Sequence, residues 1–261
     1  MYYFVEGVQG AGKSTLVGRL AGCLPDYRVY REGDYNPVEL AWCTYMTEAQ
    51  YESVLAKYDR LREEIIANTH TEGDRRIVTY TRIITDVPGF HKDLEQYEIY
   101  NNRLSRAEFE EIILTRYARW SGDNAVFECS IFQNIVENQI LFYEMTDEEI
   151  VAFFLRLKAV LAGRDFRILY LEADDIAGSL QVIRKERVDA NGNEMWFPLM
   201  VGFLEESPHG VRHGLRGFDG LVKHLTHRMV VEKRILREVF PEQAVILKSK
   251  NYDLNAVLGG L

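Results

Sequence analysis

Gly7-Val8-Gln9-Gly10-Ala11-Gly12-Lys13-Ser14 is the most informative segment of the sequence, and Thr15 follows it directly. An apolar run at 2–5 precedes the segment, and a run with apolar residues at Leu16 and Leu20 follows it. This succession predicts a strand, a glycine-rich loop and a helix, in that order. Glycines allow the backbone to wrap closely around a ligand, so that consecutive N–H groups and the positive end of the helix point at one anion.

The spacing of this segment is typical of a P-loop, which binds the phosphates of a nucleoside triphosphate. Lys13 would place a mobile positive charge beside the terminal phosphates, and the Ser14 hydroxyl would be a ligand of Mg²⁺. We therefore expect ATP and Mg²⁺ as cofactors. The residues expected to bind them are those of the loop and the helix start: Gly7, Gln9, Gly10, Ala11, Gly12, Lys13, Ser14 and Thr15.

The composition predicts a globular protein whose partner is a small molecule. A chain of 261 residues, 47% of them hydrophobic, is long enough for one large core with insertions. The net charge of −9 argues against nucleic acid as a partner, because nucleic-acid binders carry a basic face. The 3 cysteines are too scattered for a disulfide framework or a zinc site, and charges interrupt the apolar runs. We expect a cytoplasmic protein without membrane association, and the sequence leaves a homodimer open.

Predicted strands alternate with helical patterns along the chain. The strands are expected near 2–6, 27–31, 125–128, 166–171 and 243–247. This alternation predicts a doubly wound α/β fold with a five-stranded parallel sheet. Right-handed crossovers bring the carboxyl ends of such strands to one edge, which is where ligands bind. We expect 1–261 to form a single domain, with an insertion on the acceptor side over 45–120 and a lid over 174–218.

Acidic residues follow two of the predicted strands. Glu32 and Asp34 come after the second strand, and each is a candidate general base for an acceptor hydroxyl, with Glu32 nearer the strand end. Glu128 ends the third strand, where a carboxylate can hold the metal ion through water. We therefore expect Ser14 and Glu128 to form the metal site.

Positive charge in the second half of the chain suggests a lid. Arg184 and Arg187 are three residues apart and would share one side of a helix, from which they could stabilise the transferring phosphoryl group. Together with Lys13 and Glu32 they form the predicted catalytic set. The glycine-rich run 207–220 is interpreted as a mobile basic loop. Its histidines and those that follow are not expected to bind metal, because no acid or cysteine partners lie at a suitable spacing: His209, His213, His224 and His227.

The region between the second and third strands is the least regular. A helix is expected over 47–68, a strand over 77–85 and a hairpin around Asn101-Asn102. Ser105 followed by Glu108 is a capping box and predicts the start of another helix. Arg116 and Arg119 on this helix are interpreted as surface arginines, although they could meet a phosphate or a base.

On these residues the chain resembles the deoxynucleoside kinase and thymidylate kinase branch of the P-loop kinases. The matching segments are the run from Glu6 to Thr15, the acid after the second strand, the run Phe127-Glu128-Cys129-Ser130 and the basic segment from Arg184 to Arg187. The resemblance implies transfer of the γ-phosphoryl group of ATP to a nucleoside or deoxynucleoside hydroxyl, with Glu32 as the base. It also implies a metal or phosphate role for Glu128. The sequence departs from the family pattern at Cys129, which replaces an arginine, and at Gly33, which follows the acid.

Other functions remain open on the same residues. A nucleoside monophosphate kinase would need a group for the acceptor phosphate, and Arg116 or Arg119 could supply it. The run Asp86-Val87-Pro88-Gly89 resembles the Asp-x-x-Gly motif of GTPase switches, although no guanine-recognition segment accompanies it. A non-catalytic nucleotide sensor is a third alternative, suggested by the absence of an arginine at position 129.

Overall fold

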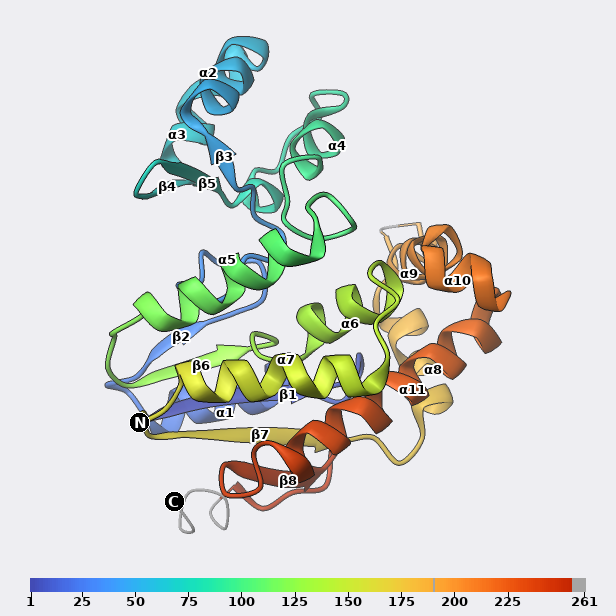
Figure 1. The fold of residues 1–261 in the computed structure, drawn as a ribbon. Coiled ribbons are helices and arrows are strands. Elements are labelled where there is room, and N and C mark those ends of the chain that lie inside the picture. The colour runs from blue at the N-terminus through green and yellow to red at the C-terminus, as the bar shows by residue number, and fades with distance from the viewer. Residues whose placement is uncertain (190, 255–261) are drawn as a thin grey trace. The chain divides into compact units, whose positions relative to one another are not determined.

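The computed structural model describes residues 1–189 and 191–254 (Figure 1). The chain divides into two compact units. Residues 1–29 and 122–261 form the first, here called the P-loop unit, and 30–121 form the second, here called the insert unit. The insert unit therefore begins before the insertion expected over 45–120.

The P-loop unit is built on a five-stranded sheet of order β2-β6-β1-β7-β8. The strands are β1 (Tyr2–Gly7), β2 (Arg28–Tyr30), β6 (Ala125–Glu128), β7 (Phe166–Glu172) and β8 (Ala244–Lys248). The central strand β1 is parallel to both of its neighbours, and β7 is parallel to β8. Central strands of this kind are covered on both faces, which is why β1 and β6 are almost continuously buried. The predicted doubly wound α/β fold and its five strands are confirmed.

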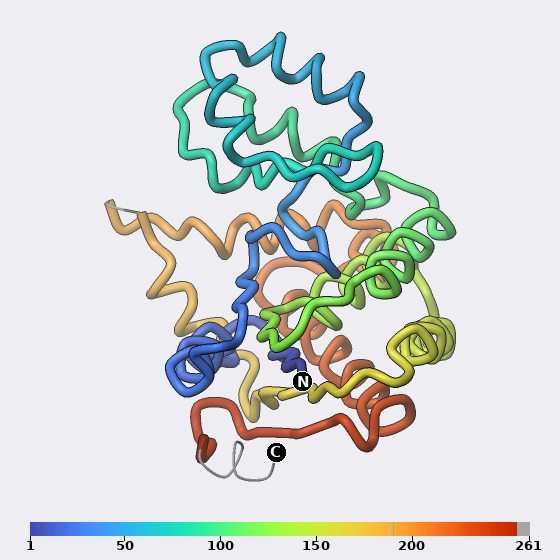
Figure 2. Tube along the Cα trace, turned by 90° about the vertical axis from the view of Figure 1, so that its left-hand side faces the viewer, coloured from blue at the N-terminus to red at the C-terminus, as the bar shows by residue number. Residues whose placement is uncertain are grey.

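Helices cover both faces of this sheet, with α1 on one face and α7 and α11 on the other in both views (Figures 1 and 2). The helices of the unit are α1 (Lys13–Cys23), α6 (Gln133–Leu141), α7 (Asp147–Val160), α8 (Ile176–Glu186), α9 (Trp196–Glu206), α10 (Pro208–His213) and α11 (Gly217–Glu238). The capping box of Thr146 and Glu149 starts α7, as the sequence pattern indicates. None of the helices in the described ranges is long and apolar enough to cross a membrane.

The expectation of a mobile loop over 207–220 is wrong, because this run contains α10 and the start of α11. Ser207 caps α10 by accepting a hydrogen bond at Oγ from the Gly210 N–H at 2.9 Å. Pro208 occupies the first turn, where its missing N–H costs nothing. Gly214 ends the helix in the left-handed region with a φ of 60°. The glycines and histidines suggested a loop, but Gly214 is a helix cap, Gly210 and Gly220 are buried within helices, and His209 and His213 lie on α10.

The insert unit contains a three-stranded antiparallel sheet of order β3-β5-β4. Its elements are β3 (Met46–Thr47), α2 (Glu48–Lys57), the 3-10 turn η1 (Asp59–Leu61), α3 (Arg62–Ala67), β4 (Thr69–Glu72), β5 (Arg75–Val78), the 3-10 turn η2 (Tyr80–Arg82), α4 (Phe90–Glu95) and α5 (Arg106–Arg119). The unit has its own apolar cluster, in which Tyr58 packs edge-to-face on the buried Phe90 with ring centroids 5.1 Å apart.

Three local expectations in the insert unit are wrong. The helix expected over 47–68 is interrupted at Tyr58, which leaves the helical region with ψ at 45°. The strand expected over 77–85 ends at Val78, because the apolar residues after it reach the core from a 3-10 turn instead of a strand. Asn101 and Asn102 both have left-handed φ values, 62° and 58°, but they form a turn without flanking strands among the described residues.

Candidate functional site

The loop between β1 and α1 has the backbone conformation that an anion site requires. Gly10 and Gly12 have φ values of 79° and 92°, in the left-handed region that favours glycine. Gly12 caps α1 without any side-chain hydrogen bond, so that no side-chain acceptor satisfies the first N–H groups of the helix. A Cβ at Gly10 would lie 2.8 Å from Ile183 Cδ1, so α8 packs closely against the loop at this glycine. This loop can therefore offer N–H groups and the positive end of α1 to a phosphate.

Lys13 and Ser14 begin α1 directly after the loop. The Lys13 ammonium is buried and donates to the carbonyl oxygens of Gly7 and Val8, at 2.9 and 3.0 Å. Ser14 donates from Oγ to Glu128 Oε1 at 2.5 Å. Glu128 comes next to the loop because the parallel register places it opposite Val5 of β1. The structure thus brings together the two residues that the sequence analysis assigned to the metal.

Glu6 is a buried acid immediately before the loop that the sequence analysis did not assign. Its carboxylate accepts hydrogen bonds from the backbone N–H groups of Ile131 and Gln133, at 2.8 and 3.2 Å. Burial raises the pKa of Glu6 to about 7, although the N–H of Ile131 lowers it. Glu6 therefore joins the end of β1 to the segment that follows β6. A charged residue inside an otherwise apolar strand was the signal that could have identified it.

Cys129, at which the sequence departs from the kinase pattern it resembles, is a buried residue in the turn after β6. Its φ is 58°, in the left-handed region, and its backbone N–H donates to Val5 O at 3.1 Å. Its Sγ lies 3.5 Å from Gln133 Oε1, and the residue is 1% exposed. A buried thiol at this position cannot replace the charge of an arginine.

The two predicted lid arginines lie at the end of α8 in the P-loop unit. Arg184 donates from Nε to Glu194 Oε1 at 2.9 Å, and its guanidinium lies 4.3 Å from the ring centroid of Phe197. Arg187 is the C-cap of α8, with its guanidinium 5.6 Å from the ring centroid of Trp196. Both arginines therefore contact the first turn of α9. Their action on a phosphoryl group stays a prediction.

Glu32 and Asp34 belong to the insert unit and have different partners. Asp34 accepts a hydrogen bond from the backbone N–H of Arg31 at 2.9 Å and forms an ion pair with Arg82. Glu32 is exposed and accepts a hydrogen bond from the indole N–H of Trp42 at 3.2 Å. Because the Asp34 carboxylate is already engaged by Arg31 and Arg82, Glu32 stays the proposed base.

The interpretation of Arg116 as a surface residue is wrong. Its side chain is buried, forms an ion pair with Glu72 and donates from Nη2 to the carbonyl oxygen of Asn36 at 2.5 Å. The sequence pattern could not show this, because the partners lie 44 and 80 residues away along the chain. Arg119 is exposed, as expected. Arg116 therefore stabilises the insert unit.

Glu39 is a second buried acid that the sequence analysis missed. Its Oε1 accepts hydrogen bonds from the Ala41 N–H at 2.7 Å and from the Tyr100 hydroxyl. Burial raises the pKa of Glu39 to about 8, against the lowering effect of these hydrogen bonds.

Glu39→Gln should remove part of the pH dependence of stability. Glu39 keeps its proton up to about pH 8 in the folded chain, whereas in the unfolded chain it loses the proton near the ordinary glutamate pKa of about 4.5. Its contribution to the free energy of unfolding is therefore full below about pH 4.5 and declines up to about pH 8. Between these two pH values the free energy of unfolding should fall by up to about 1.4 kcal/mol per pH unit because of Glu39. Gln retains the acceptor oxygen without the titration, so the variant should flatten this slope in urea denaturation from pH 5 to 8. An unchanged slope would show that Glu39 is not protonated in the folded chain.

Four histidines of α10 and α11 gather around one cavity of about 240 Å³. The cavity is lined by His209, His213, Leu215, Lys223, His224 and His227. Burial lowers the pKa values of His209 and His224 to about 4, so both rings are neutral at pH 7. Within residues 1–189 and 191–254, no group of three or more His, Cys, Asp or Glu side chains is arranged to hold a metal ion.

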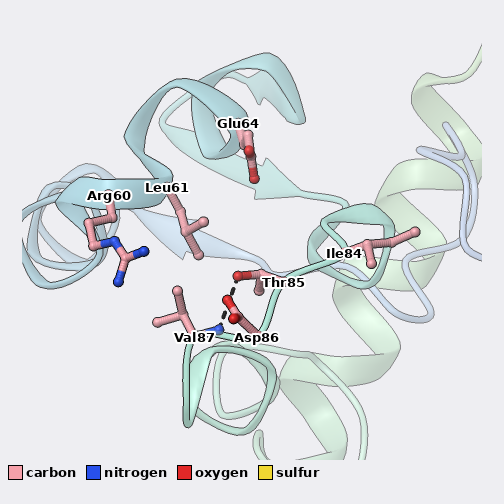
Figure 3. Close-up of a pocket in the computed structure, with 7 residues that line it drawn as sticks. All are labelled: Arg60, Leu61, Glu64, Ile84, Thr85, Asp86 and Val87. Carbon is pink, nitrogen blue, oxygen red and sulfur yellow. Dashed lines mark hydrogen bonds between the residues drawn. The ribbon is translucent and has the colours of Figure 1, made fainter.

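The Asp-x-x-Gly match lies in the insert unit, where Asp86 borders a surface hollow of about 560 Å³ (Figure 3). The hollow is lined by Arg60, Leu61, Glu64, Ile84, Thr85, Asp86 and Val87. The Val87 N–H donates to Thr85 Oγ1 at 3.1 Å. Gly89 is the N-cap of α4, with a φ of 79°. The start of a helix therefore accounts for this glycine without a switch function.

No protein-family model matches the chain, and no curated protein matches it. Among solved structures, a gluconokinase from Sinorhizobium meliloti 1021 is similar over 96% of this chain and 83% of its own. The two are 12% identical, with a TM-score of 0.33. A similarity this distant carries no conclusion about function, which is argued below from the residues themselves.

Proposed function

We propose that the chain is an ATP-dependent phosphotransferase that phosphorylates a hydroxyl group of a small molecule. The single observation that carries this proposal is the contact of Ser14 with Glu128, 2.5 Å apart, beside the glycine loop and Lys13. A hydroxyl at a helix start, a carboxylate at the end of the neighbouring parallel strand and a loop lysine are the parts that phosphoryl transfer uses.

The residues present fit ATP with Mg²⁺. The uncapped start of α1 supplies N–H donors for the phosphates, and Lys13 supplies a positive charge. Ser14 and Glu128 would hold Mg²⁺, Ser14 directly and Glu128 directly or through water. When bound, Mg²⁺ would neutralise charge on the phosphate oxygens.

The chain's own residues then perform the transfer in one in-line step. The acceptor oxygen forms a bond to the γ-phosphorus as the bond from that phosphorus to the β,γ-bridging oxygen breaks, and ADP leaves with the electron pair. Glu32 receives the proton of the acceptor hydroxyl. Lys13 stabilises the charge that develops on the leaving phosphate, after moving from the carbonyl oxygens of Gly7 and Val8.

We propose a nucleoside or deoxynucleoside as the acceptor. The resemblance of the segment from Glu6 to Thr15 and the acid after β2 support this choice. A nucleoside monophosphate is less well supported, because the Arg116 guanidinium is already bound by Glu72 and by the Asn36 carbonyl.

The test is an assay of the purified chain with Mg²⁺–ATP and a panel of nucleosides, nucleotides and sugar acids. One phosphorylated product, identified by mass spectrometry, is the expected result. Tight ATP binding without any product would favour a nucleotide sensor. Preference for GTP, with slow hydrolysis and no acceptor, would favour a switch.

Glu32→Gln is expected to lower kcat by roughly 10²-fold while the Kd of ATP changes little, because a general base contributes on this scale and Glu32 is assigned to the acceptor. Turnover and calorimetric titration with ATP measure the two quantities. Asp34→Asn is the matched control, because Asp34 is already paired with Arg82. Retention of most of the rate by Glu32→Gln would remove Glu32 from this role.

A further inference from the structure

Arg228 is a fully buried arginine of α11 whose guanidinium contacts the P-loop. Its Nη2 donates to Gln9 Oε1 at 2.7 Å, and Nη1 binds Glu137 of α6. Its Nε lies 3.2 Å from Glu232 Oε1, and the other oxygen of Glu232 accepts from the Tyr170 hydroxyl at 2.6 Å. All of these residues belong to the P-loop unit. A buried charged network thus ends on a side chain of the loop itself.

This contact determines which way the Gln9 amide faces. A guanidinium is only a donor, so the group of Gln9 that meets Arg228 must be the carbonyl oxygen. The Gln9 NH₂ group therefore points away from Arg228, and within residues 1–189 and 191–254 it donates to no protein group. Gln9 is also half-buried instead of enclosed, so its two N–H donors remain available to a ligand in the loop.

We propose that Gln9 donates a hydrogen bond to the transferring phosphoryl group and that Arg228 is the positioning residue that holds the Gln9 amide in this orientation. The inference rests on the proposed function and adds two residues to it. Glu137 of α6 and Glu232 of α11 form ion pairs with the guanidinium, whose Nη2 is directed at the loop. An arginine needed only for packing could be replaced by apolar residues, whereas one that orients Gln9 could not.

Gln9→Met and Gln9→Glu test the donor. The first removes the amide, and the second keeps an acceptor for Arg228 but no longer donates. Both should lower kcat about 10- to 100-fold. Loss of one hydrogen-bond donor to the transition state usually lowers kcat by about 100-fold or more, so the expected effect is at the lower end of that scale or below it. Aluminium fluoride bound with Mg²⁺–ADP mimics the transferring group. The ratio of the affinity for this mimic to the affinity for Mg²⁺–ADP alone should fall at least about 10-fold in both variants. A kcat within twofold of wild type, or an unchanged affinity ratio, would overturn the proposal.

Arg228→Lys tests the positioning role through a double-mutant cycle. The single variant should lower kcat by a factor close to that of Gln9→Met, because lysine lacks the fork that holds both Glu137 and Gln9. Added to Gln9→Met, it should lower kcat by less than about twofold more. If the kcat reductions of the two single variants multiply in the double variant, Arg228 acts independently of Gln9, and the positioning role is wrong.

Tyr170→Phe is the matched control, because it alters the same network at Glu232 without touching Arg228 or Gln9. It should lower the melting temperature and leave kcat within about twofold of wild type. If the Arg228 variant does not fold, the affinity ratios of the Gln9 variants still decide the donor role. If the wild-type chain phosphorylates no acceptor, the kinase proposal fails, and the fluoride titration still tests Gln9 independently.

Discussion

Replacing Lys13 by alanine is expected to lower kcat at least about 10³-fold, because a fixed cationic donor to the phosphoryl oxygens is worth that much or more in this chemistry. In the ligand-free chain the ammonium is buried and held by the carbonyl oxygens of Gly7 and Val8. It can exchange these neutral partners for phosphate oxygens. The alanine variant should also bind Mg²⁺–ATP more weakly, while nucleoside affinity is unchanged.

Steady-state kinetics and calorimetric titration with Mg²⁺–ATP measure these effects. Lys158→Ala is the matched control, because Lys158 is an exposed residue of α7 in the same unit. The Lys13 variant should still fold, and its circular dichroism spectrum should match that of the wild type. Activity within tenfold of wild type in a folded Lys13→Ala variant would contradict the assignment of this loop as the triphosphate site.

The parallel sheet and its loop could be predicted from local sequence, because the information is local. Residues 2–5 of strand β1 form a continuous apolar run, and the glycines that follow lie where the backbone has positive φ. Glu128 could be placed beside Ser14 because parallel strands end at one edge of the sheet. These inferences need only strand direction and periodicity.

Contacts between distant segments could not be predicted in the same way. Arg228 lies 219 residues from Gln9, and no local pattern in the sequence links the two residues. Arg116 was similar, since nothing nearby in the sequence marks its partners Glu72 and Asn36. In the insert unit, residues of high strand propensity such as Tyr80 and Ile83 are held in a core without forming a strand. Tertiary packing overrides local propensity there.

Glu128→Gln is expected to lower kcat by about 10³-fold, because loss of a metal-holding carboxylate removes several kcal/mol of charge stabilisation and each 1.36 kcal/mol is tenfold in rate. Glutamine keeps an oxygen that can accept from the Ser14 hydroxyl, so the loop should keep its shape. The variant should therefore melt at or above the wild-type temperature, since it no longer buries a carboxylate.

The sharper measurement is the Mg²⁺ concentration that gives half-maximal rate, which should rise about tenfold in Glu128→Gln if each charge contact contributes roughly 1.4 kcal/mol. Glu172→Gln is the matched control, because Glu172 also ends a strand of the sheet but pairs with Lys233. Glu172→Gln should leave the Mg²⁺ requirement unchanged. If the two variants behave alike, position 128 is an ordinary acid at the end of a strand, and Ser14 would then need a different partner for the metal.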